Sequence, residues 1–123
     1  MADEVVKVSE ETKNQVALMQ EKEWFNTFID AAQGIVVKIS DFSWDIIVKY
    51  HALGKLLLDY EIKFKEDGRT IGEMEAIVSE QVNRSTRTIR RAKQFYQTYP
   101  DLEKAPYTSG AQWTQILNDL KKK

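Results

Sequence analysis

The chain has 123 residues, a formal net charge of −1 and a hydrophobic fraction of 42% that includes three Trp, five Tyr and five Phe. This length and apolar content suit one compact domain and give no case for two. Cysteine is absent, which excludes disulfides, thiolate metal sites and cysteine nucleophiles. The sequence shows neither a secretory signal pattern nor an apolar run long enough to cross a bilayer, so we expect a soluble cytoplasmic protein.

Residues 1–20 form an acidic, polar segment with few large apolar side chains. We expect it to be either a frayed helix or a mobile arm that adds little to the core, with residues 21–123 forming a single helical domain. From Met1 to Asp30 there are seven acids against three lysines. Such a segment can dock on a basic surface, recruit a protein partner or remain a solvated tail, and the sequence leaves these alternatives open.

Two long helices are predicted next from apolar residues that recur at threes and fours. The first runs from Lys22 to about Ser40 and has Gly34 inside it, as a weak point or a close packing contact. Ser40, Asp41 and Ser43 supply a break and a cap before the second, which is the strongest helix of the chain. In this helix Gly54 would let another helix approach closely, and Gly68 follows at a C-terminal position. The second helix carries the apolar stripe Ile46, Tyr50, Leu53, Leu57, Tyr60 and Phe64.

Residues 70–99 read as two short helices joined by a three-residue turn, a helix-turn-helix layout. Thr70 and Glu73 form a capping box, so a helix starts at Ile71. The turn is Asn83, Arg84 and Ser85, all of them turn or cap residues. The first helix is predicted to bury Ile71, Met74, Ile77, Val78 and Val82, and the second Ile89, Ala92, Tyr96 and Tyr99.

The second of these helices is basic. Between Arg84 and Tyr99 there are five basic residues and no acid. At about 100° per residue, one polar face opposite the apolar stripe gathers Arg87, Arg90, Arg91, Gln94 and Thr98. Arginine can contact phosphates or read guanine, and glutamine can read adenine, so this face predicts binding to double-stranded DNA. The predicted DNA-binding residues are Arg84, Ser85, Thr86, Arg87, Arg90, Arg91 and Gln94. Lys93 lies nearer the apolar stripe, and we expect it to snorkel and to matter less.

A last helix is predicted after the Tyr99-Pro100 break, opened by a capping box of Ser109 and Gln112. It carries Ala111, Trp113, Ile116, Leu117 and Leu120 before a Lys tail. No segment alternates apolar and polar residues as a half-buried strand would. The predicted fold is therefore all-α, with about five helices in a compact bundle that contains the helix-turn-helix.

Three phrases of the sequence resemble a known family. They are residues 50–58 (YHALGKLLL), 91–100 (RAKQFYQTYP) and 109–117 (SGAQWTQIL). They are similar to the N-terminal helical DNA-binding domain of bacterial PD-(D/E)xK nucleases, and the resemblance covers roughly residues 24–120. The nuclease half of that family has no counterpart in these residues, so the resemblance implies DNA binding without cleavage.

Catalytic chemistry has little support in the sequence. The single histidine, His51, falls in the middle of the strongest helix, where a packed structural role is expected, and no metal-ligand set forms around it. The glycines make no phosphate-binding motif. Trp24, Trp44 and Trp113 each fall on an apolar stripe and predict core packing. We therefore expect no enzyme activity, no cofactor and no metal.

Two function classes remain. The first is a DNA-binding protein, a small transcription regulator or an accessory factor of plasmid, phage or chromosome maintenance. The second is a helical protein-interaction module that does not bind nucleic acid. A homodimer is expected if the first class holds, because one helix-turn-helix reads few base pairs alone. The apolar face of residues 24–39 can serve a partner or be wholly consumed by the core, and both readings stay open.

Overall fold

The computed structural model describes residues 9–39 and 42–121, which form six α-helices and one short 3-10 helix, with no strand in those ranges. The helices are α1 (Glu10–Met19), α2 (Glu23–Val37), α3 (Ser43–Glu66), α4 (Ile71–Val82), α5 (Thr86–Thr98) and α6 (Trp113–Lys121). The 3-10 helix Leu102–Lys104 lies between α5 and α6. The all-α prediction is confirmed for the described residues, and the helix beyond the expected five is α1.

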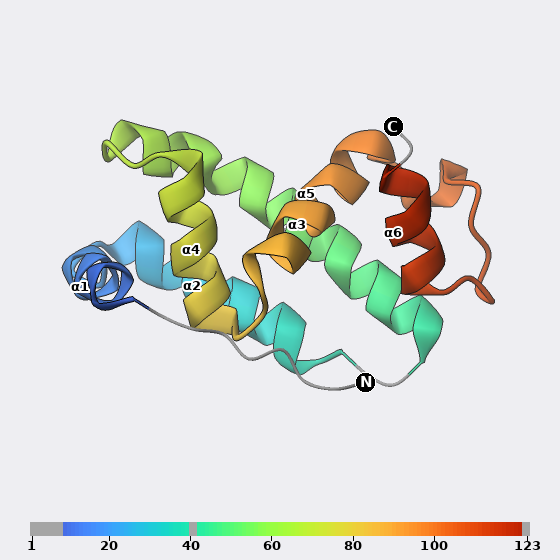
Figure 1. Ribbon diagram of the computed structural model, residues 1–123, viewed down its shortest axis with the longest axis horizontal. Coiled ribbons are helices and arrows are strands. Elements are labelled where there is room, and N and C mark those ends of the chain that lie inside the picture. Colours follow the sequence, from blue (N-terminus) through green and yellow to red (C-terminus); the bar gives the residue numbers. More distant parts are fainter. Residues whose placement is uncertain (1–8, 40–41, 122–123) are drawn as a thin grey trace.

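The longest helix, α3, is the central element (Figure 1). α2 packs along one side of it, α5 crosses it, and α6 stands beside α5 near the C-terminus. α4 packs against α1, α2, α3 and α5. This arrangement gives α5 a support on three other helices, which fixes how its polar face is presented. None of the described helices has the length and apolar character needed to cross a membrane.

The core consists of two clusters that meet at Trp113. The larger cluster draws on α1 to α5, and the smaller one fills the space between α3, α5 and α6 around Phe95 and Ile116. The rings of Tyr50 and Phe95 lie 4.8 Å and 5.5 Å from Trp113. Trp24, Trp44 and Trp113 are half-buried against these clusters, so the expected packing role of the three tryptophans is confirmed. Offset aromatic pairs of this kind add directional contacts to the area they bury.

The crossing of α3 and α5 depends on Gly54. A Cβ at this position would overlap the carbonyl oxygen of Ala92 and would lie 2.8 Å from its carbonyl carbon. The backbones of the two helices therefore touch, as the sequence predicted. Gly34 on α2 has no neighbour within 4 Å of a Cβ placed there, so it makes no close packing contact.

The ends of α3 and α4 follow the sequence signals. Gly68 has a φ of 81°, the left-handed conformation that favours glycine after a helix end. Thr70 and Glu73 form the predicted capping box, with Glu73 Oε1 accepting from the Thr70 backbone at 2.9 Å. That bond lowers the pKa of Glu73. Ser40 and Asp41, expected to start α3, lie outside the described residues, and α3 begins at Ser43.

The helix alternative for the N-terminal segment holds over residues 10–19, but two other details expected at the ends of the chain are wrong. Residues 10–19 form α1, whose Val16 and Met19 are buried in the larger cluster, so this part of the acidic segment does contribute to the core. The Ser9 side chain caps α1 by accepting from the Thr12 backbone. The last helix begins at Trp113 rather than after Ser109, because residues 108–111 are held in a turn by the bond from Ala111 N to Thr108 O.

Candidate nucleic-acid interface

The turn between α4 and α5 has a defined backbone. Asn83 adopts a left-handed conformation with a φ of 54°, which asparagine tolerates better than most residues. The Arg84 N–H donates to the Ser79 carbonyl at 3.2 Å, and the Ser79 hydroxyl donates to the Arg84 carbonyl at 2.5 Å. These bonds tie the turn to the last residues of α4, so α5 leaves the turn in a fixed direction.

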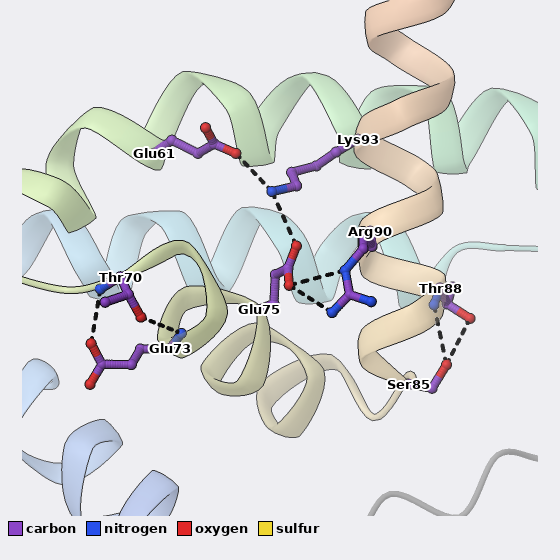
Figure 2. A network of polar contacts seen from close by, with 8 residues as sticks. All are labelled: Glu61, Thr70, Glu73, Glu75, Ser85, Thr88, Arg90 and Lys93. Carbon is purple, nitrogen blue, oxygen red and sulfur yellow. Dashed lines mark hydrogen bonds and ion pairs between the residues drawn. The ribbon is translucent and has the colours of Figure 1, made fainter. Parts of the chain in front are cut away.

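Ser85 then starts α5. Its hydroxyl accepts from the Thr88 backbone N–H at 3.2 Å and lies 3.2 Å from the Thr88 hydroxyl (Figure 2). A cap of this type satisfies one of the free N–H groups of the first turn. That turn contains no acidic residue, so its positive end is not offset by a neighbouring carboxylate of its own helix.

The N-terminal half of α5 is open to solvent. Thr86, Arg87 and Arg90 are exposed, and Arg87 makes no ion pair within the described ranges. Arg84, just before the helix, is half-buried and donates to the Tyr50 hydroxyl at 3.4 Å and to the Asn83 carbonyl at 3.0 Å. The accessible polar groups are therefore two arginines and a threonine within five residues of the helix start.

Most polar side chains in the C-terminal half of α5 are covered by neighbouring elements, and Gln97 is the exposed exception. Arg91 donates from Nη1 to Gln94 Oε1 at 2.7 Å, and Gln94 Nε2 donates to the Leu120 carbonyl of α6 at 3.2 Å. Thr98 donates to the Gln94 carbonyl at 2.8 Å. Arg91, Gln94 and Thr98 are half-buried, so the continuous polar face expected from Arg87 to Thr98 is divided. The amide of Gln94 in particular is already hydrogen-bonded within the protein, whereas the helical pattern predicts an amide free to contact a base.

A network of four charged side chains joins α3, α4 and α5 (Figure 2). Lys93 Nζ lies 2.8 Å from Glu61 Oε2 and 3.3 Å from Glu75 Oε2, and Glu75 Oε1 accepts from Arg90 Nη2 at 3.0 Å. The side chains of Glu75 and Lys93 are only 7% and 10% exposed, and each has its charge compensated by neighbours. Lys93 therefore does not snorkel to water as expected, because two carboxylates hold its ammonium inside.

Glu75 was not singled out for this role by the sequence, although a signal was present. It shares one face of α4 with the buried residues Val78 and Val82, three and seven positions later. A carboxylate on a buried face needs a cationic partner, and the next helix is the most basic part of the chain. The hydrogen bond and charge of Glu75 raise the pKa of the Arg90 guanidinium.

The other titratable groups of interest in the described chain are the acidic side chains, as candidate metal ligands, and His51. Within residues 9–39 and 42–121 no three His, Asp or Glu side chains converge in a group that could hold a metal. His51 Nε2 lies 2.7 Å from the Tyr99 carbonyl, and its ring packs against Phe95 and Tyr96. This is the packed structural position expected for it.

Comparisons with protein-family models, with curated proteins and with solved structures found no match to this chain.

Proposed function

We propose that this protein binds double-stranded DNA through α4 and α5 acting as a helix-turn-helix, with the N-terminal half of α5 in the major groove. The observation that carries the proposal is the exposure of Arg87 and Arg90 in the first half of α5, which contains no acidic residue. In helix-turn-helix proteins the first residues of the second helix contact base edges, while the first helix crosses the DNA backbone. The open half of α5 is the half that this geometry requires.

In the N-terminal, solvent-exposed half of α5, different groups suit different parts of the DNA. Arg87 has no partner within the described ranges, so its whole guanidinium fork is available for a guanine or a phosphate. The backbone N–H groups at the start of α5 and the hydroxyl of Thr86 suit phosphate oxygens. The resemblance to the DNA-binding domain of bacterial PD-(D/E)xK nucleases points the same way. The expected role is a small regulator or an accessory factor of plasmid, phage or chromosome maintenance, without cofactor, metal or catalysis.

The test is a mobility-shift titration of genomic DNA fragments at two salt concentrations. We expect Arg87→Ala to weaken specific binding by about 1 to 3 kcal/mol, because it removes a contact made only with DNA. The matched control is Gln97→Ala. Gln97 is exposed but lies in the C-terminal half of the same helix, so this variant should bind DNA as the wild type does. Both variants should melt at the wild-type temperature. Equal affinities of Arg87→Ala and wild type would refute the assignment.

We also propose that the protein binds DNA as a homodimer on two half-sites about one helical turn apart. Most of the apolar face of α2 is used by the core, since Phe25, Phe28 and Ile29 are buried, and Val37, 81% exposed, is the main apolar side chain that it leaves for a partner. The proposed dimer surface is therefore this remaining part of α2 or the last helix, α6. Light scattering that gives a strict monomer with and without DNA would refute the dimer.

The alternative function, a protein-interaction module, is favoured by four exposed large apolar side chains. They are Leu18, Val37, Phe42 and Ile62. The mobility-shift titration separates the two functions. A protein that is only an interaction module shows no DNA affinity even at low salt, so Arg87→Ala has no affinity to reduce.

A further inference from the structure

Arg90 differs from Arg87 in that a buried carboxylate holds it. Glu75 Oε1 accepts from both Arg90 Nε, at 3.3 Å, and Arg90 Nη2, at 3.0 Å. A guanidinium has five N–H groups, so three remain, two on Nη1 and one on Nη2. The Arg90 side chain is 62% exposed although Glu75 is 7% exposed, so the free N–H groups are the ones that solvent can reach.

Glu75 is itself held in place. Its second oxygen, Oε2, lies 3.3 Å from Lys93 Nζ, and Lys93 is anchored 2.8 Å from Glu61 on α3 (Figure 2). The carboxylate that holds Arg90 is thus itself held by Lys93 of α5, which is anchored in turn to α3. A long side chain normally loses rotamer freedom when it binds a partner, and a side chain ordered beforehand avoids much of that loss.

We infer that Glu75 is a positioning residue that holds the Arg90 guanidinium ready to bind a DNA phosphate. The inference rests on the proposed function. The contact is assigned to a phosphate because Glu75 belongs to α4, and the first helix of a helix-turn-helix crosses the DNA backbone. Arg90 thus lies on the α4 side of α5, where it contacts the backbone, and the unpaired Arg87 contacts the bases.

The inference makes a prediction opposite in sign to simple electrostatics. Glu75→Gln removes a negative charge beside the DNA, so charge alone predicts tighter binding. Loss of positioning predicts affinity about threefold to tenfold weaker, with the salt dependence unchanged because Arg90 keeps its charge. Arg90→Ala should also weaken binding to all sequences alike, and should reduce the salt slope by about 1.

The matched control is Glu61→Gln, which removes a carboxylate from the same network without touching Arg90. Its DNA affinity should fall less than that of Glu75→Gln, because Glu61 reaches Glu75 only through Lys93. An equal loss would overturn the direct role of Glu75 on Arg90. In an Arg90→Ala background, Glu75→Gln should cause no further loss, since its effect passes through Arg90. Circular dichroism melts of each variant establish that the folded protein is compared.

Fluorescence anisotropy with a labelled duplex decides between the outcomes. Wild-type or tighter binding by Glu75→Gln, together with weakened binding by Arg87→Ala, overturns the positioning role and leaves the proposed function standing. Absence of DNA binding by the wild-type protein overturns both. If Glu75→Gln does not fold, Arg90→Lys takes its place, because an ammonium keeps the charge but lacks the planar fork. It should lose most of the affinity that Arg90→Ala loses, and wild-type affinity would overturn the inference.

Discussion

The two halves of α5 carry similar polar side chains but have different surroundings. In the first half Thr86, Arg87 and Arg90 face solvent, whereas in the second half Arg91 and Gln94 are half-buried and bonded to each other and to α6. A helical repeat places all of them on one side of the helix. The difference teaches that the elements packed around a helix, rather than its own pattern, decide which polar residues can meet a partner.

The largest expected effect on stability comes from disrupting the contact between α3 and the C-terminal half of α5. Gly54→Ala places a methyl group against the carbonyl of Ala92 and 3.0 Å from Tyr96 Cβ, so α3 and α5 must separate. Overpacking of this severity should lower the free energy of unfolding by about 3 kcal/mol, measured by urea denaturation. The main obstacle is backbone, which cannot move aside as a side-chain tip can.

Gly34→Ala is the matched control, since Gly34 is also inside a helix but has open space around it. Alanine there should raise the free energy of unfolding by roughly 0.5 to 1 kcal/mol through its better helix propensity. Similar free energies for the two variants would mean that the crossing of α3 and α5 is looser than described.

Most of the fold could be predicted from local signals. The start of α4, the turn at residues 83–85 and the role of Gly54 follow from caps, turn residues and apolar spacing, and the structure confirms them. The contribution of α1 to the core is hard to predict from the sequence, because only two of its side chains, Val16 and Met19, enter the core. The start of α6 was misplaced because the spacing of Ser109 and Gln112 mimics a capping box.

The site was less predictable, because its limits are set by contacts between residues distant in sequence. The bond from Gln94 to the Leu120 carbonyl spans 26 positions, and that from Lys93 to Glu61 spans 32. No helical pattern within α5 contains either partner. The basic character of the helix was visible in the sequence, but the division between its open and covered halves was not.

A smaller effect tests that division directly. Gln94→Ala removes the bonds to Arg91 and to α6, and should lower the free energy of unfolding by about 1 kcal/mol. Its DNA affinity should stay within about twofold of wild type, because Gln94 faces α6. Gln97→Ala, the same substitution at an exposed position of the same helix, should change neither quantity. If Gln94→Ala instead loses as much DNA affinity as Arg87→Ala, Gln94 does contact DNA and the division of α5 is wrong.

The smallest expected effect concerns the acidic segment. Deleting it up to Glu21 would also remove Val16 and Met19 from the core, so its charge is better tested by Glu10→Gln with Glu11→Gln, two exposed positions in the first turn of α1. If these acids compete with DNA for the basic helix, affinity should rise by less than about twofold at 0.1 M salt, where the screening length is about 10 Å, and by more at 0.01 M, where it is about 30 Å. Fluorescence anisotropy across a salt series measures both. Equal affinities throughout would show that these two acids do not act on the open half of α5, and would favour a tail or a partner-binding role for the segment.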